Sequence, residues 1–311
     1  MTGPRPFRFG VVCARGTSRA DWTAKARKVE ALGYAILLVP DHLGEQLAPL
    51  PALLAAAEAT TSLRVGSLVL ANDFRHPVVL AKEAATLDLL SAGRFELGLG
   101  AGWMRSEYEQ AGLRFDPPVI RIERMGEAVR IIKALLGEDP VSFTGAHYSL
   151  SGLTGLPKPV QRPRPPILVG GGGRRTLSIA AREADVVGLV PRAHADGGGL
   201  DVTDATAAAT IRKVEWIRAE AEERFAELEL NLLVQAVVAT DDRRAAAAQL
   251  AARFRTTAEL VLDTPYVLMG THGQIEEDLR ERRERYGVSY LAVFESSMDA
   301  LAPVVARLAG A

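Results

Sequence analysis

Cysteine is almost absent from this chain of 311 residues, because Cys13 is the only one and has no partner for an internal disulfide. Aromatic residues are also sparse, at 6%, and no run approaches the roughly 18 uncharged apolar residues of a membrane-spanning helix. The sequence therefore excludes a disulfide-stabilised scaffold and does not favour a membrane-embedded protein. Hydrophobic residues still make up 48%, enough for an extensive core.

An excess of charge of either sign is missing too. Lys and Arg number 37 and Asp and Glu number 38, which gives a net charge of −1. A protein that binds duplex nucleic acid is usually basic overall or along one face. The first ten residues lack the charged and apolar regions of a signal peptide. We therefore expect a cytoplasmic protein with no nucleic-acid or membrane partner.

Short apolar segments alternate with longer helical patterns along the chain. The expected strands are 7–13, 35–39, 64–71, 95–100, 167–169, 185–190, 229–239 and 289–294. The expected helices are 19–32, 51–60, 76–90, 119–136, 174–183, 205–225, 243–254, 273–286 and 298–308. Thr271 and Gln274 have the spacing of a capping box at the start of the helix 273–286.

This alternation predicts an α/β fold, a single (β/α)8 TIM barrel spanning 1–311, with a doubly wound open sheet as the alternative. A hairpin inserted at about 141–165 interrupts the pattern. Residues 191–204, which include the run Gly197–Gly199, are expected to form a mobile loop after the sixth strand. In a barrel that loop lies at the face where sites form.

Glycines cluster after two of the expected strands. Gly98, Gly100 and Gly102 do not have the G-x-G-x-x-G spacing, so a tight turn explains them better than a dinucleotide site. The run Gly170–Gly173 is a stronger signal, because it leads into a helix that opens with Arg174 and Arg175. Converging backbone N–H groups and a helix N-terminus suit a phosphate. A flexible turn with solvated arginines is the alternative.

Asp41 and His42 follow the second expected strand, where a barrel would place them at its mouth. Histidine changes charge near neutral pH, and a neighbouring carboxylate can bias its tautomer. A structural role and a catalytic role are equally compatible with this position. The five histidines show no paired spacing and Cys13 stands alone, so no metal site is expected.

Four segments together resemble the luciferase-like flavin and deazaflavin oxidoreductases over nearly the whole chain. They are VPDHLG, RVGSLVLANDFRHP, LDLLSAGRFELGLGAGW and ILVGGGGRRTLSIAAREAD, which begin at Val39, Arg64, Leu87 and Ile167. The motifs RFELGLGAGW and ANDFRHP are most similar to the branch that uses coenzyme F420.

The resemblance implies a luciferase-like TIM barrel with the coenzyme ring at its mouth and a cis peptide bond at Leu68–Val69. It implies that His42 is the catalytic proton donor or acceptor and that Asp41 orients it. The cofactor-binding residues that it implies are Leu68, Val69, Ala71, Asn72, Gly100, Ala101, Gly102, Trp103, Gly171, Gly172, Gly173 and Arg174. Asn72 and Trp103 would also shape the substrate pocket.

The resemblance implies hydride transfer between F420 and a small organic substrate. An FMNH2-dependent two-component monooxygenase, supplied by a separate reductase, and a non-catalytic flavin-binding barrel are the alternatives. A homodimer is expected from the family. The sugar-phosphate dehydrogenases of the family carry an acid where this chain has Trp103, which argues against glucose 6-phosphate as its substrate.

Overall fold

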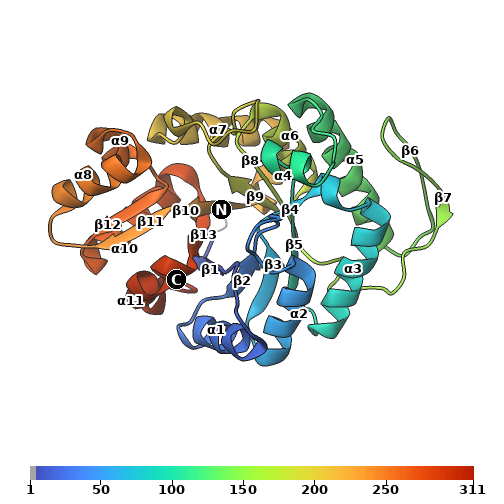
Figure 1. Ribbon diagram of the computed structural model, residues 1–311, viewed down its shortest axis with the longest axis horizontal. Helices are drawn as coiled ribbons and strands as arrows, with labels where there is room; N and C mark the ends of the chain where they lie inside the picture. Colours follow the sequence, from blue (N-terminus) through green and yellow to red (C-terminus); the bar gives the residue numbers. More distant parts are fainter. Residues whose placement is uncertain (1–4) are drawn as a thin grey trace.

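The computed structural model describes residues 5–311, and a closed barrel of parallel strands forms its centre (Figure 1). The barrel strands are β1 (Arg8–Val12), β2 (Ile36–Val39), β3 (Arg64–Ser67) with β4 (Leu70–Ala71), β5 (Phe95–Gly100), β8 (Ile167–Gly171), β9 (Val186–Leu189), β10 (Glu229–Val234) and β13 (Val288–Phe294). Strand β1 pairs with both β2 and β13, which closes the sheet on itself. The predicted eight-stranded barrel is confirmed, and an open doubly wound sheet is excluded.

The third barrel strand is interrupted between β3 and β4 by the peptide bond Leu68–Val69. This bond is cis, as the family resemblance implies. Strand β3 pairs with β2 and β5, and β4 continues along β5. The half-buried side chains of Leu68 and Val69 pack on an apolar cluster inside the barrel that includes Ile36, Leu38 and Leu168. The interruption therefore places two apolar side chains at the inner end of the barrel mouth.

Helices alternate with the strands, and most of them surround the barrel (Figure 1). They are α1 (Arg19–Ala31), α2 (Pro49–Ala59), α3 (Pro77–Leu90), α4 (Arg105–Gln110), α5 (Pro118–Leu136), α6 (Arg174–Glu183), α7 (Ala207–Ala221), α8 (Arg243–Phe254), α9 (Ala258–Asp263), α10 (His272–Tyr286) and α11 (Met298–Leu308). The capping box of Thr271 and Gln274 is confirmed at the start of α10. Within the described residues, no helix has both the length and the apolar character needed to cross a membrane.

The predicted strand 229–239 is wrong as a single element. It divides at Gln235 into β10, which stays in the barrel, and β11 (Ala236–Ala239), which pairs with β12 (Val267–Gly270) in a separate sheet. The sequence prediction also missed β12. With α8 and α9, these strands form an excursion at the left of Figure 1 that has its own apolar core. One apolar run can supply two sheets because its pattern does not specify its partners.

An antiparallel hairpin of β6 (Val141–Thr144) and β7 (Ser149–Leu153) projects on the opposite side of the barrel (Figure 1). It lies where the sequence predicts an inserted hairpin. Its turn is fixed by the buried carboxylate of Glu127 on α5, which accepts the backbone N–H groups of Ala146, His147 and Tyr148 at 2.7, 3.0 and 3.2 Å. The turn is therefore held against the barrel although the strands project outward.

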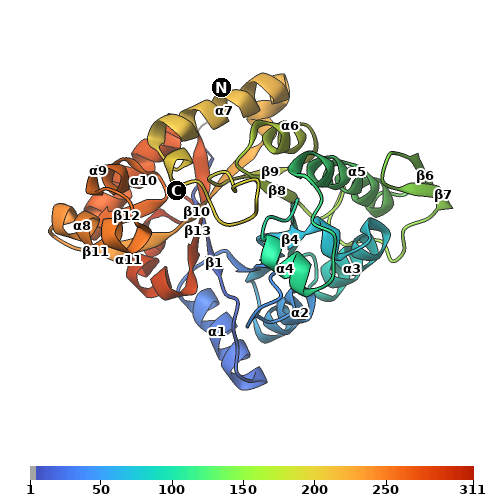
Figure 2. The same cartoon turned by 45° about the horizontal axis from the view of Figure 1, so that its top comes forward.

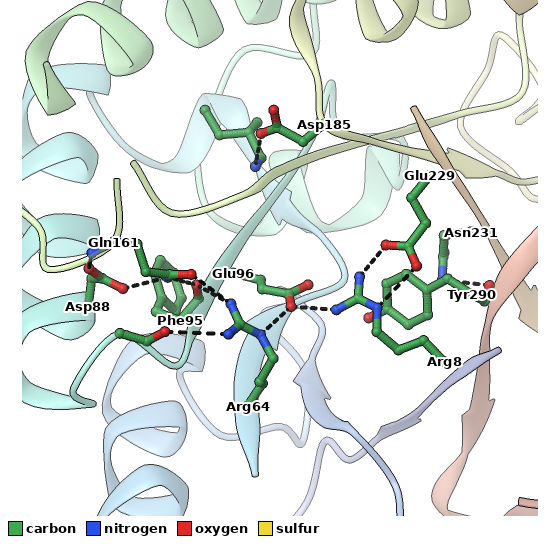
Figure 3. A network of polar contacts seen from close by, with 12 residues as sticks. Arg8, Arg64, Asp88, Phe95, Glu96, Gln161, Asp185, Glu229, Asn231 and Tyr290 are labelled. Atoms are coloured by element: carbon green, nitrogen blue, oxygen red, sulfur yellow. Dashed lines mark hydrogen bonds and ion pairs between the residues drawn. The ribbon is translucent and has the colours of Figure 1, made fainter. Parts of the chain in front are cut away.

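The barrel is closed at the amino ends of its strands by charged side chains (Figure 3). Arg8 lies between Glu229, at 2.6 Å, and Glu96, and Glu96 also pairs with Arg64. The Arg8 guanidinium stacks on the ring of Tyr290 at 3.9 Å. Burial opposes the charge of Arg8, but Glu96 and Glu229 outweigh it, so its pKa is raised. This floor lies at the end of the barrel opposite the mouth.

Candidate functional site

The predicted site residues gather at the barrel mouth. The carboxyl ends of all strands of a parallel barrel open at one face. His42 follows β2, Asn72 follows β4, Trp103 follows β5, and the glycines Gly171–Gly173 end β8 and precede α6. Residues from four separate strand ends therefore line one opening.

Glu107 of α4 contacts the imidazole of His42. Its two carboxylate oxygens lie 3.1 and 3.0 Å from Nδ1 of His42, and one of them accepts the backbone N–H of Leu43 at 2.9 Å. The Glu107 side chain is 11% exposed, whereas the His42 side chain is 26% exposed. Trp103 meets the imidazole edge-on, with ring centroids 6.1 Å apart. The histidine is therefore held from one side and open to solvent on another.

The expectation that Asp41 orients His42 is corrected by these contacts. The Asp41 carboxylate turns to the next strand, where it accepts the backbone N–H of Ala71 at 3.0 Å and pairs with Arg75 at 3.2 Å. Adjacent residues of an extended segment point to opposite sides, so sequence neighbours need not share a partner. Asp41 holds the segment that follows Leu68–Val69, and Glu107 holds His42.

The turn after β5 is built around close packing. Gly102 has a φ of +72°, and a Cβ there would lie 1.9 Å from the hydroxyl oxygen of Tyr108. Arg121, which is 4% exposed, donates to the carbonyl oxygens of Ala101, at 3.1 Å, and Gly102. Burial, with Asp73 nearby, raises the pKa of Tyr108, so its phenol stays neutral. These contacts fix Gly100–Trp103 as one wall of the mouth.

Asn72 lies at the end of β4 and is 2% exposed. Its amide nitrogen lies 3.5 Å from the hydroxyl of Tyr148, which comes from the turn between β6 and β7. Asp73, next in the chain, pairs with Arg124 of α5 at 3.0 Å. The segment after the third strand is thus supported by both α5 and the hairpin.

The glycine loop before α6 fits a phosphate group. Gly173 is the N-cap of α6 and supplies no side-chain cap, so the first N–H groups of the helix have no partner from that residue. A Cβ on Gly173 would meet nothing within 4 Å, which shows open space above the helix end. A Cβ on Gly172 would lie 2.5 Å from the carbonyl oxygen of Val190, so the loop passes too close for a larger residue. Arg174 is exposed at the first helical position.

The segment after β9, residues 191–204, reaches across the mouth (Figure 2). Arg105 of α4 donates to the carbonyl oxygen of Asp196 at 2.8 Å, and Gly197 approaches the backbone of Trp103 so closely that a Cβ would lie 2.6 Å from its carbonyl oxygen. Asp204, at the other end, pairs with the fully buried Lys213 of α7 at 2.6 Å. The segment therefore links the β5 side of the mouth to α7. Its mobility stays a prediction.

The remaining thiol and acid groups at this end of the barrel do not form a metal site among the described residues. Cys13 is buried after β1, and burial raises the pKa of its thiol to about 12. No group of three or more His, Cys, Asp or Glu side chains is arranged to hold a metal ion within residues 5–311.

Glu107 and Arg121 are the site residues that sequence reasoning missed. Glu107 lies two residues before Glu109, which is exposed and only 3.6 Å from Arg105 in a surface pair. The sequence Ser-Glu-Tyr-Glu does not distinguish a buried acid from a solvated one. Only the fold brings Glu107 to His42 across 65 positions of sequence.

The model of the family described as luciferase-like monooxygenase matches residues 7–303. An FMNH2-dependent dimethylsulfone monooxygenase of Pseudomonas putida is 33% identical over 145 residues, 47% of this chain and 39% of that protein. An F420-dependent glucose-6-phosphate dehydrogenase of Microbacterium testaceum is 32% identical over 164 residues, 50% of this chain and 48% of that protein. The chain thus spans about half or less of the length of these curated relatives.

A solved structure of an F420-dependent secondary alcohol dehydrogenase, in complex with an F420–acetone adduct, has the same fold. Its TM-score is 0.77 at 18% identity, and the match covers 97% of this chain and 99% of that one.

Proposed function

The chain belongs to the luciferase-like monooxygenase family, and from this premise we propose that it is an F420-dependent oxidoreductase that transfers hydride between the coenzyme and a small organic substrate. The observation that carries the proposal is that His42 and the open N-terminus of α6 lie at the same mouth of the barrel. In our proposal His42 transfers a proton, and the N-terminus of α6 binds an anion. F420-dependent relatives support this choice of coenzyme.

The residues present fit such a coenzyme. Leu68 and Val69 offer a half-buried apolar platform for a flat ring, and the Gly171–Arg174 loop offers backbone N–H groups and a helix N-terminus for a phosphate. The remaining proposed contacts, Ala71, Asn72 and Gly100–Trp103, come from the two strand ends beside this platform. When bound, the deazaflavin supplies the carbon that gives or accepts hydride.

His42 is the proposed catalytic residue. Hydride transfer to or from a polar bond must be balanced by a proton, and an imidazole can give or accept it near neutral pH. Trp103 stands beside this position, and Trp103 and Asn72 shape the substrate pocket in our proposal. Asp41 contributes by holding Ala71 in place.

An FMNH2-dependent monooxygenase is the second candidate, because the Pseudomonas putida relative carries that activity in its name. The phosphate of FMN would suit the same glycine loop. This alternative requires oxygen, and the F420 proposal does not. A homodimer and a cytoplasmic location complete the proposal, and the family resemblance and the single cysteine support them.

The two candidates differ in their use of oxygen. The protein is mixed with reduced F420 or with reduced FMN, with and without oxygen, and with a panel of small ketones, enones and imines. We expect substrate-dependent oxidation of reduced F420 without oxygen, and its loss in His42→Ala. Oxidation only of FMNH2, with consumption of oxygen, would replace this proposal by the monooxygenase.

A further inference from the structure

We propose that Glu107 is a positioning residue that keeps the ring hydrogen of His42 on Nδ1 and leaves Nε2 to exchange the reaction's proton. The inference rests on the proposed function for its chemical consequence. The tautomer itself can be measured without coenzyme or substrate.

The first argument is the nature of the contact. An ionised carboxylate has no hydrogen to donate, so a nitrogen within hydrogen-bond distance of it must be the donor. Both oxygens of Glu107 lie close to Nδ1 of His42, at 3.1 and 3.0 Å. A neutral imidazole that donates through Nδ1 has its lone pair on Nε2. Among the described residues, Nε2 has no hydrogen-bond partner that would compete for it.

The second argument is that the carboxylate cannot turn away. One of its oxygens accepts the backbone N–H of Leu43 at 2.9 Å, and the side chain is buried. The next residue, Tyr108, fixes the helix by donating to Asp73 at 3.2 Å. Glu107 therefore reaches His42 from a helix that is itself anchored to the segment after the third strand.

The bond to Leu43 makes Glu107→Gln a sharp test. The Leu43 N–H is a donor, so the single oxygen of a glutamine would be required there. The glutamine NH2 group would then face Nδ1 of His42 and donate to it. Because an N–H group 3.0 Å from Nδ1 repels a hydrogen there, the imidazole would favour its hydrogen on Nε2. In that form Nε2 cannot accept a proton, and it cannot donate one without leaving an imidazolate, because Nδ1 carries no hydrogen. A change of one oxygen to nitrogen thus reverses the tautomer with little change of shape.

The experiment measures ¹⁵N shifts of the histidine ring nitrogens in the coenzyme-free protein, with His42→Ala to assign the signals. We expect a hydrogen on Nδ1 in the wild-type protein and on Nε2 in Glu107→Gln. Turnover in Glu107→Gln should fall by about a hundredfold or more, as wrong-tautomer variants of other enzymes do, with the coenzyme Kd within about twofold. Glu109→Gln is the matched control on the same helix and should leave both quantities unchanged.

Two results would overturn the inference: a wild-type imidazole with its hydrogen on Nε2, or a Glu107→Gln variant that keeps wild-type turnover. The first does not depend on Glu107→Gln, so it stands even where that variant fails to fold. A tautomer that reverses in a protein without F420 turnover would support the positioning role and reject the proposed function.

Discussion

The Asp41 carboxylate accepts the backbone N–H of Ala71 at 3.0 Å, whereas the imidazole of the adjacent His42 faces Glu107. The two neighbours therefore contact different parts of the mouth: Asp41 contacts the end of β4, and His42 contacts α4.

Asp41→Asn should separate these roles. The substitution removes the charge that faces Arg75 and leaves that guanidinium without its buried partner, at a cost of about 2–4 kcal/mol in the free energy of unfolding. We expect coenzyme binding to weaken about tenfold or more, because the segment that carries Ala71 and Asn72 loosens. Chemical denaturation and a binding titration measure both effects. An unchanged coenzyme Kd would contradict the positioning role of Asp41.

The glycine loop gives a second prediction from two adjacent residues. Gly173→Ala adds a methyl group into open space, so stability should change by less than about 0.5 kcal/mol while the coenzyme phosphate loses room and binding weakens about tenfold. Gly172→Ala drives a Cβ against the backbone of Val190 and Arg192 and should destabilise the fold instead. Unfolding curves and coenzyme titrations of both variants check this. Full coenzyme affinity in Gly173→Ala would place the phosphate elsewhere.

The ionic floor of the barrel should affect stability and not binding. Glu96→Gln removes the carboxylate shared by Arg8 and Arg64, and we expect a loss of about 3 kcal/mol in the free energy of unfolding. The coenzyme Kd should not change, because the floor and the mouth are at opposite ends of the barrel. Glu277→Gln, at an exposed position of α10, is the control. A loss of coenzyme binding with unchanged stability would be the opposite of this expectation.

The carboxyl of Glu30 should make the free energy of unfolding depend on pH. The backbone N–H of Ser62, and those of Leu63 and Thr61, outweigh desolvation and lower the pKa of Glu30 from 4.5 to about 2. A carboxyl with a lower pKa in the folded state stabilises the protein above its unfolded pKa, and this contribution is lost as pH falls from about 4.5 to 2. Glu30→Gln should therefore cost about 1 kcal/mol at pH 7, after allowance for solvent screening, and almost nothing near pH 2. Denaturation at several pH values, with the exposed Glu58→Gln as reference, tests this; a constant difference would contradict it.

Much of the fold follows from local signals. Short apolar runs predict the barrel strands, and the pattern of the chain places the glycine loop after the fifth of them, as the structure has it. The capping box at Thr271 is a local signal too, because its two hydrogen bonds lie within four residues. The cis bond at Leu68–Val69 was expected from the resemblance alone.

Long-range contacts explain the features of the fold and of the site that local patterns do not predict. The division of residues 229–239 between β10 and β11 depends on β12, some thirty residues further along, which no local pattern pairs with β11. Glu107 contacts His42 only because the barrel closes, and the same is true of the hydrogen bond that Arg121 donates to the carbonyl oxygen of Gly102. Chain adjacency suggested Asp41 as the partner of His42, and strand geometry directs Asp41 to Ala71 instead.

Binding of F420 and of FMN, measured side by side on the purified protein by fluorescence titration, tests the central claim most directly. We predict that F420 binds at least about tenfold more tightly than FMN, and that Gly173→Ala weakens its binding. Tight binding of FMN with weak binding of F420 would contradict the account and assign the barrel to the oxygen-using branch of its family.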